Sequence, residues 1–564
     1  MADPSDSPTL TDAQIARLAE VGTERDVEAG ELLFREGDPA YDFFVVLDGE
    51  VNVYADLECE RPILPEPIRA GRMLGEMGLL LGENVYATAR VEAGGRVLQV
   101  PADAFRDLIG RDTGLAETIL AAFATRRGRV SEGGSGLTLV GAQTDPDAVR
   151  LAEFARRNYL PVRWLTPDDD EAASVLDACG RTGELDGAVV VWGTETVLDT
   201  PSNLQLAEAV GILGEMPGDE TADLVVIGAG PAGLAAAVYG ASEGLRTVVV
   251  DEVGPGGQAS WSSRIENYLG FPAGISGTEL ATRATVQARK FGACLVTPRR
   301  AVGLGRDGDA YTVALASAEE AGGPTLRGRT VVIATGAHYN RLPLANMRHF
   351  EGAGVYYAAT EMETRGCEAE TVVVVGGGNS AGQAAMFLSE RAARVLLLLR
   401  GDELGTSMSS YLAERIEASD AIEVRTRTEV RELHGDGTEH EALAAVTIEA
   451  TETGSTERVD VAGLYVFIGA SPCTSWLKGD GDHRLGVALD DRGFVLAGAD
   501  VPPVCLGDAW DGARPGTFET SLKGVFAVGD VRSGSTKRVA GAVGEGAVAV
   551  KAVHRRLSAP RPEA

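Results

Sequence analysis

The sequence predicts a multidomain chain: an N-terminal β-barrel or jelly roll with helices, a small α/β domain, and two Rossmann-like α/β nucleotide-binding domains. Three observations predict it. Short β-rich runs separated by glycine turns fill residues 1–130. Strand and helix patterns alternate over residues 137–213. Within residues 222–558, two glycine-rich turns each follow an apolar strand and precede a helix.

The composition indicates a folded, acidic protein. The chain has 564 residues, with 51 Lys and Arg against 83 Asp and Glu, a net charge of −32. This charge argues against a nucleic-acid-binding protein and against a polybasic membrane anchor. No apolar run reaches about 18 residues, and the first residues lack the features of a signal peptide. We therefore expect a cytoplasmic protein that binds neither nucleic acid nor membrane.

The cysteines and two polar joints complete this outline. The six cysteines are scattered without a C-x-x-C pair, so we expect reduced thiols and no metal site. Residues 131–136 (SEGGSG) have the composition of a flexible linker. Residues 214–221 (GEMPGDET) form a second joint, which is polar and contains proline and glycine. These joints predict segments at 1–130, 137–213 and 222–558.

The first segment resembles the cyclic-nucleotide-binding domain family. The resemblance lies in residues 31–38 (ELLFREGD), 43–53 (FFVVLDGEVNV) and 75–80 (GEMGLL). It implies a ligand pocket that begins at Gly75 and Glu76, with an arginine about eleven residues later on the cyclic phosphate. That position falls on Tyr86 or Ala87, and Arg90 follows three or four residues further on. We therefore expect a pocket whose phosphate contact is lost or rebuilt through Arg90, and poor binding of cyclic nucleotides.

The second segment resembles the thioredoxin and glutaredoxin fold in its order of strands and helices. That fold places its redox cysteines between the first strand and the first helix, where the helix N-terminus lowers a thiol pKa. The corresponding loop, residues 141–146 (GAQTDP), has no cysteine, and the usual proline before the third strand is also missing. We expect a thioredoxin-like domain without CxxC that acts as a scaffold or docking domain, with Cys179 as a small buried hydrophobe.

The third segment opens with a dinucleotide-binding pattern. Residues 223–228 (DLVVIG) predict a strand, and residues 228–233 (GAGPAG) supply G-x-G-x-x-G before a helix. Asp251 ends the next strand, 23 residues after the first glycine. The glycines permit a tight turn and close approach of the backbone, the helix N-terminus suits a pyrophosphate, and the carboxylate suits a ribose hydroxyl.

A second copy of this pattern follows. The strand at residues 371–375 leads into residues 376–381 (GGGNSA), a G-x-G-x-x-A form. The next strand ends at Arg400 instead of an acid, which indicates a 2′-phosphate on the ribose. Two dinucleotide sites in one chain predict one flavin site and one nicotinamide site.

Further motifs make residues 222–558 resemble thioredoxin reductase and its relatives in the pyridine nucleotide-disulfide oxidoreductase family. They are GGQ at 256–258, IENYLGFP at 265–272, ATG at 334–336, VFAVGD at 525–530 and KRVA at 537–540. The resemblance implies an FAD-binding domain at 222–340 and 466–558 and an inserted NAD(P)H-binding domain at 341–465. It also implies FAD and NADPH, or NADH, as cofactors, and a homodimer.

The resemblance also implies site residues. Those for FAD are Gly228, Gly230, Pro231, Ala232, Gly233, Asp251, Gly257, Gln258, Asn267, Thr335, Gly336, Gly529, Asp530, Arg538, Val539 and Ala540. Those for NAD(P) are Gly376, Gly378, Asn379, Ser380, Ala381 and Arg400.

The sequence departs from the family at the redox cysteines. Thioredoxin reductases carry C-A-T-C before the second fingerprint, where this chain has Ala358 and Glu361 at the two cysteine positions. An internal disulfide needs two thiols within bonding distance, so we assign no catalytic residue. Cys367 lies nearby, and we expect it to be structural.

These observations predict an FAD-dependent NAD(P)H oxidoreductase that passes electrons to an external acceptor. The resemblance implies a small redox protein, such as ferredoxin or flavodoxin, as the acceptor. Two alternatives stay open. One is a thioredoxin-disulfide reductase that acts on a partner's disulfide, and the other is a redox or nucleotide sensor, a regulatory flavoprotein.

Overall fold

The computed structural model shows two compact units. One comprises Met1–Trp261, Ile275–Gly336 and Cys473–Ala564, and the other comprises Ser262–Gly274 and Ala337–Pro472. The structure describes residues 8–558 except 36–37, 39–40, 57–60, 63–65, 82–86, 133–136, 143–144, 159, 161, 182–186, 193–195, 215, 219, 263–264, 266, 317–322, 345, 352, 358, 360–366, 368–369, 405–407, 436–441 and 479–484.

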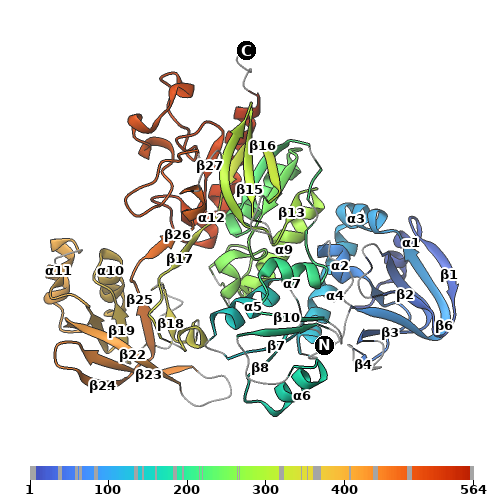
Figure 1. Cartoon of the computed structure of the whole chain (residues 1–564), viewed down its shortest axis with the longest axis horizontal. Coiled ribbons are helices and arrows are strands. Elements are labelled where there is room, and N and C mark those ends of the chain that lie inside the picture. Colours follow the sequence, from blue (N-terminus) through green and yellow to red (C-terminus); the bar gives the residue numbers. More distant parts are fainter. Residues whose placement is uncertain are drawn as a thin grey trace. The chain divides into compact units, whose positions relative to one another are not determined.

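The N-terminal residues form an antiparallel β-domain with helices, drawn in blue in Figure 1. Its strands run in the order β1-β6-β3-β4, with β2 on β6 and β5 on β3. Phe43 stacks on Phe105 in the core, with ring centroids 4.2 Å apart. The elements are α1 (Asp12–Ala19), β1 (Thr23–Val27), β2 (Leu32–Phe34), β3 (Phe43–Asp56), β4 (Arg61–Pro62), β5 (Met73–Leu74), α2 (Glu76–Leu81), β6 (Thr88–Val100), α3 (Ala102–Arg111) and α4 (Thr113–Glu132).

Helix α4 corrects one expectation. It continues through Ser131 and Glu132, the first two residues of the predicted linker, and residues 133–136 lie outside the described part. Serine and glutamate cost a helix little, whereas the paired glycines that follow are poor helix formers.

The next segment folds as the strand and helix pattern predicts. Its sheet has the order β10-β9-β7-β8, in which β8 is parallel to β7 while β9 is antiparallel to it. Leu139, Leu151, Phe154 and Leu206 are fully buried between the sheet and its helices. The elements are β7 (Leu137–Val140), α5 (Pro146–Arg157), β8 (Val162–Leu165), α6 (Asp170–Ala178), β9 (Val189–Trp192), β10 (Thr196–Asp199) and α7 (Asn203–Ala209).

A seven-stranded sheet follows in the same unit, in the order β13-β12-β11-β16-β15-β14, with β27 on β16. Strands β13, β12, β11, β16 and β27 are parallel, which places the loops at their carboxyl ends along one edge. The elements are β11 (Ala222–Ile227), α8 (Pro231–Ser242), β12 (Thr247–Val250), η1 (Gly257–Trp261), α9 (Gly277–Lys290), β13 (Cys294–Val296), β14 (Ala301–Asp307), β15 (Ala310–Leu315), β16 (Thr325–Ile333), η4 (Ser475–Lys478), η6 (Gly498–Asp500), η7 (Pro503–Cys505), η8 (Asp508–Trp510), β27 (Val525–Ala527), η9 (Gly529–Val531) and α12 (Val539–Ser558).

Helix α9 contacts two parts of this unit. Its Val286 belongs to the same buried cluster as Phe43 and Phe105 of the N-terminal β-domain. At its first turn, the Thr278 hydroxyl donates to the carbonyl oxygen of Ser260 in η1 at 3.1 Å. One helix therefore contacts both the N-terminal core and the loop that follows β12.

The second unit is built on a parallel five-stranded sheet in the order β18-β25-β19-β20-β21. Val372 and Leu397 are fully buried in it. The elements are β17 (Ala337–Tyr339), η2 (Met347–Phe350), β18 (Val355–Tyr356), β19 (Thr371–Val375), α10 (Asn379–Leu388), β20 (Arg394–Leu398), α11 (Ser410–Glu417), β21 (Ile422–Arg425), β22 (Thr428–Gly435), β23 (Leu443–Ala450), β24 (Ser455–Asp460), β25 (Gly463–Val466) and β26 (Ala470–Pro472). Across the described part of the chain, no helix has the length and apolar character needed to cross a bilayer.

The contact between α8 and α12 generates the first prediction. A Cβ on Gly546 would overlap the carbonyl oxygen of Ala232, whereas a Cβ on Gly544, in the same helix, would meet nothing within 4 Å. Gly546→Ala should therefore destabilise the protein by about 1–3 kcal/mol, because the helices must separate. Gly544→Ala should stabilise it by up to about 1 kcal/mol. Thermal unfolding measures both, and equal effects would contradict the assigned contact.

Candidate functional site

The first glycine-rich turn permits a strand and a helix to approach closely. Gly228 follows β11 with φ +107°, and a Cβ there would overlap the carbonyl oxygen of Ala334. A Cβ on Gly233 would overlap the carbonyl oxygen of Gly228. Glycine is thus required at both positions, and Pro231 starts α8 directly after the turn.

A second loop forms the other side of this turn. The N–H of Gly256 donates to the carbonyl oxygen of Ala229 at 2.8 Å. A Cβ on Gly257 would lie 2.9 Å from the Cα of Gly230. The two glycine backbones form a narrow cradle beside the N-terminus of α8, a position suited to a diphosphate.

Asp251 is held against the same turn. Its Oδ2 accepts from the N–H of Ala229 at 2.8 Å, and its Oδ1 accepts from Val253 and Gly254 at 3.0 and 2.9 Å. Oδ1 also accepts from Nη2 of Arg157 at 3.1 Å. Sequence reasoning found Asp251 from its spacing but missed Arg157, which is 94 residues away and belongs to no local motif.

The C-terminal part of the chain brings Gly529 and Asp530 to this point. Gly529 has φ +72°, and a Cβ there would lie 2.8 Å from the Cβ of Ala232, so η9 abuts the start of α8. Burial raises the pKa of Asp530, an effect that the positive charge of Lys537 opposes. Burial likewise lowers the pKa of Lys537. The predicted residues 228–233, 251, 257 and 529–530 therefore lie close together.

The other residues predicted for FAD are more dispersed. The Thr335 hydroxyl donates to the carbonyl oxygen of Cys473 at 2.8 Å, beside Gly336. Gln258 is half-buried in η1, whereas Asn267 is exposed and falls in the second unit. Arg538, Val539 and Ala540 lie at the start of α12, with only Val539 half-buried.

The second glycine-rich turn has the same construction in the second unit. Gly376 has φ +142°, and a Cβ there would overlap the carbonyl oxygen of Phe467. Gly378 immediately precedes α10, and a Cβ on it would meet nothing within 4 Å. Ala381 is buried, Ser380 is exposed, and Oδ1 of Asn379 accepts from a backbone N–H. The open backbone before α10 again suits a diphosphate.

A second arginine, Arg427, lies near the end of β20, and sequence reasoning missed it. Arg400 is exposed there, as the pattern predicts. Arg427, with φ +47°, donates its N–H to the carbonyl oxygen of Gly401 at 3.0 Å. Its guanidinium pairs with Asp402, at 2.5 Å, and with Glu452, and this hydrogen bond lowers the pKa of Asp402. No sequence motif links Arg427 to the end of β20, because Arg427 lies in the connection between β21 and β22.

Comparisons with known proteins identify the family. The family model described as pyridine nucleotide-disulphide oxidoreductase matches residues 222–546, more than half of the chain. The chain belongs to this family. The model of the cyclic nucleotide-binding domain matches residues 24–112, as the motifs of the first segment predict.

Relatives agree with this assignment. The chain is 32% identical over 343 residues to a protein named thioredoxin reductase from Streptomyces clavuligerus, covering 60% of this chain and 94% of the relative. It is 33% identical over 333 residues to one from Mycolicibacterium smegmatis, covering 58% and 94%. The crystal structure of thioredoxin reductase from Streptococcus pyogenes MGAS5005 matches with a TM-score of 0.50 at 29% identity, covering 60% and 98%.

The chain is therefore an FAD-dependent oxidoreductase with two nucleotide-binding units of the pyridine nucleotide-disulphide oxidoreductase type, fused to a cyclic nucleotide-binding domain. Its two glycine-rich turns fit the two cofactors of the family, FAD and NAD(P)H, because each leads directly into a helix N-terminus and contains a glycine at which a side chain would clash. Among the described residues, no cluster of His, Cys, Asp or Glu could hold a metal ion.

Two thiols of this oxidoreductase, those of Cys367 and Cys473, have a pKa raised by burial. The two residues at the positions of the redox cysteines, Ala358 and Glu361, lie outside the described residues. Cys367 is buried, with Sγ 3.2 Å from the Tyr465 hydroxyl, and burial raises its pKa. Burial raises the pKa of Cys473 to about 11. Cys179 is half-buried instead of fully buried as predicted, because it lies at the end of α6.

In the cyclic nucleotide-binding domain, the side chains of Tyr54 and Glu92 bind the Arg90 guanidinium. Nη2 of Arg90 lies 2.9 Å from the Tyr54 hydroxyl, and Nε lies 2.9 Å from Oε1 of Glu92. Gly75 has φ +95°, and Glu76 starts α2 with 1% of its surface exposed. Of the two positions aligned with the phosphate-binding arginine, Ala87 is 5% exposed and Tyr86 lies outside the described residues.

Thiol reactivity gives the second prediction. Alkylation needs a thiolate and access, so iodoacetamide at about pH 8 should label the exposed Cys505 much faster than Cys473. Since the pKa of Cys473 is raised to about 11, its labelling rate should climb with pH through that value. Mass spectrometry of the labelled peptides measures both rates. Rapid labelling of Cys473 near neutral pH would contradict its assigned burial.

Proposed function

We propose that this oxidoreductase passes electrons from NAD(P)H through FAD to an external acceptor, a small redox protein such as ferredoxin or flavodoxin. One observation carries the proposal: the chain keeps both nucleotide-binding units while Ala358 and Glu361 replace the cysteine pair. Without that pair, the chain has no internal disulfide at this position to receive electrons.

The residues around α8 are proposed to bind FAD. The turn at Gly228–Gly233 and the cradle with Gly257 would receive the diphosphate, and Asp251 the adenosine ribose. Gly529 and Asp530 would lie along the ribityl side, as the family resemblance implies. When bound, FAD supplies the capacity to accept a hydride and to release electrons to an acceptor.

The residues around α10 are proposed to bind NAD(P)H. Gly376 and Gly378 would leave room for the diphosphate at the helix N-terminus. Arg400, exposed at the end of β20, would meet a 2′-phosphate and so favour NADPH. The acidic partners of Arg427 oppose a second phosphate contact, so NADH stays the alternative.

Reduction of a partner's disulfide is the second candidate. It is supported by the name thioredoxin reductase that the relatives from Streptomyces clavuligerus and Mycolicibacterium smegmatis carry. In this scheme the disulfide would come from the partner alone. Comparing NADPH-driven reduction of thioredoxin with that of ferredoxin and flavodoxin separates the two candidates.

The additional segments are proposed to regulate or dock. We assign residues 1–130 to the cyclic nucleotide-binding domain, 137–213 to a thioredoxin-like domain without a dithiol, 222–340 with 466–558 to the FAD domain, and 341–465 to the NAD(P)H domain. The sheet order β10-β9-β7-β8 supports the thioredoxin-like assignment. A regulatory flavoprotein is a third candidate, supported by the N-terminal domain. The homodimer implied by the family resemblance stays a prediction.

The missing cysteine pair sets the stoichiometry of reduction, our third prediction. Anaerobic titration should consume one equivalent of NAD(P)H per FAD, since no dithiol is present to take a second pair of electrons. Absorbance of the flavin follows the titration. Cys367→Ser should leave this value and dye reduction nearly unchanged. Consumption of two equivalents, or lost turnover in Cys367→Ser, would restore the disulfide-reductase candidate.

Cyclic nucleotide affinity is the fourth prediction. Arg90 already engages Tyr54 and Glu92, so a cyclic phosphate would have to displace these partners to bind it. A charge-assisted hydrogen bond contributes about 1.5–3 kcal/mol, so affinity for cyclic AMP or GMP should be lower by about tenfold or more. Calorimetry measures it. Low-micromolar binding that Arg90→Ala abolishes would show that Arg90 has rebuilt the phosphate contact.

A further inference from the structure

A salt bridge connects helix α5 to the acid that we propose for the adenosine ribose of FAD. Nη2 of Arg157 donates to Oδ1 of Asp251 at 3.1 Å and to the carbonyl oxygen of Gly254. The two charged side chains are only 8% and 13% exposed. An ion pair so far removed from water is costly to bury, and it is retained where it fixes a specific geometry.

One carboxylate oxygen of Asp251 can accept a further hydrogen bond. Oδ1 accepts from Arg157 and from the N–H groups of Val253 and Gly254. Within the described residues, Oδ2 accepts one hydrogen bond, from the N–H of Ala229 at 2.8 Å. A carboxylate oxygen has about two acceptor sites, so Oδ2 can receive one further donor, such as a ribose hydroxyl.

Arg157 also retains donor capacity. Its Nε is buried, and no described residue accepts a hydrogen bond from it. A buried donor without an acceptor costs about 1–3 kcal/mol, and more when it is charged. Since the same guanidinium holds Asp251, this unsatisfied donor adds to the cost of burying the ion pair, as expected for a pair that fixes a geometry.

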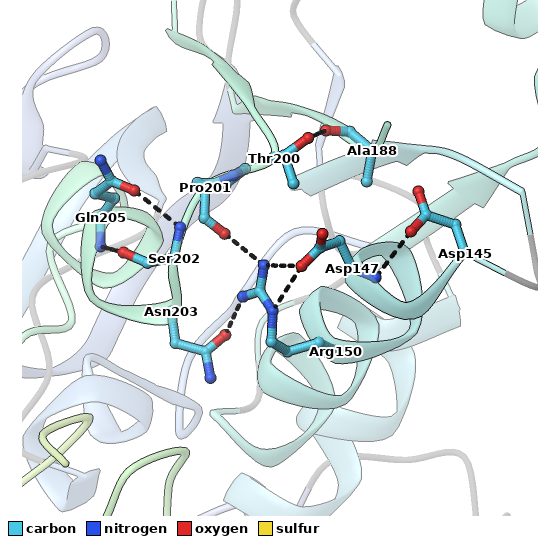
Figure 2. A network of polar contacts seen from close by, with 9 residues as sticks. All are labelled: Asp145, Asp147, Arg150, Ala188, Thr200, Pro201, Ser202, Asn203 and Gln205. Carbon is cyan, nitrogen blue, oxygen red and sulfur yellow. Dashed lines mark hydrogen bonds and ion pairs between the residues drawn. The ribbon is translucent and has the colours of Figure 1, made fainter. Parts of the chain in front are cut away.

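The N-terminal end of α5 is fixed by a polar network, shown in Figure 2. Asp145 caps the helix by accepting from the N–H of Asp147. The Arg150 guanidinium donates to Asp147 at 2.7 Å, to the Asn203 amide oxygen at 2.7 Å and to the carbonyl oxygen of Pro201 at 2.8 Å. These contacts anchor α5 to the start of α7 and limit the freedom of its other end.

The residues that flank Arg157 attach the other end of α5 to the loop after β12. Nδ2 of Asn158 donates to the carbonyl oxygen of Val253 at 2.6 Å. Nη1 of Arg156 donates to the carbonyl oxygen of Ser260 at 2.9 Å. A Cβ on Gly254 would lie 2.7 Å from Oδ1 of Asn158, so only glycine permits this contact. Three consecutive side chains therefore engage one loop, and only Arg157 reaches Asp251.

We infer that Arg157 is a positioning residue of the FAD site, which holds Asp251 for a ribose hydroxyl and completes the adenosine subsite from outside the FAD-binding segments. The inference rests on the proposed FAD site. It makes the segment of residues 137–210 a part of cofactor recognition, although that segment carries no dithiol. Binding of the adenosine half of FAD and attachment of α5 should then strengthen each other.

The test is FAD titration of flavin-free protein, followed by quenching of flavin fluorescence. Arg157→Met keeps the length of the side chain but removes its charge and donors. It should weaken FAD binding by about tenfold or more while leaving FMN, which lacks adenosine, unaffected. Arg157→Lys should recover part of the loss, and it replaces Arg157→Met if thermal unfolding shows that the latter does not fold.

Ribose analogues separate positioning from general stability. Wild-type protein should bind FAD more tightly than analogues lacking the adenosine 2′- or 3′-hydroxyl, and Arg157→Met should lose this discrimination. Asn158→Ala, which loosens the same attachment without touching Asp251, should retain it. Unchanged discrimination and FAD affinity within about twofold in Arg157→Met would overturn the inference. Failure of the wild-type protein to bind FAD would instead overturn the proposed function.

Discussion

The close approach of several backbones at the N-terminus of α8 is the constraint on which the rest of the candidate site depends. Gly228 and Gly233 belong to one turn, Gly529 and Gly546 come from the C-terminal part of the chain, and each would collide with a neighbour if it carried a Cβ. The absence of side chains on Gly529 and Gly546 lets η9 and α12 approach Ala232 at the start of α8. The turn therefore lies directly at a helix N-terminus, the position that we propose for the diphosphate of FAD.

Acidic side chains near the proposed cofactor sites pair with arginines, in a chain with a net charge of −32. Three acids near the proposed cofactor sites form ion pairs: Asp251 with Arg157, Glu545 with Arg532, and Asp402 with Arg427. The first two pairs are largely buried, so their value lies in fixing geometry more than in adding stability.

Local patterns allowed much of this architecture to be predicted from sequence. The glycine turns, the acid at the end of β12 and the order of elements over residues 137–210 all depend on neighbours within about 25 residues. The contacts of Arg157 with Asp251 and of Arg427 with Asp402 could not be predicted, since they join side chains from separate elements. Asn267, chosen by motif, falls in a different compact unit from Gln258 for the same reason.

Helix α9 has a consequence for how this protein unfolds. Because Val286 belongs to the hydrophobic cluster around Phe43 and Phe105, the core of the N-terminal domain includes a residue from a helix of the part that carries the first glycine turn. Heat or denaturant should therefore melt the two parts as one cooperative block, with no separate early transition.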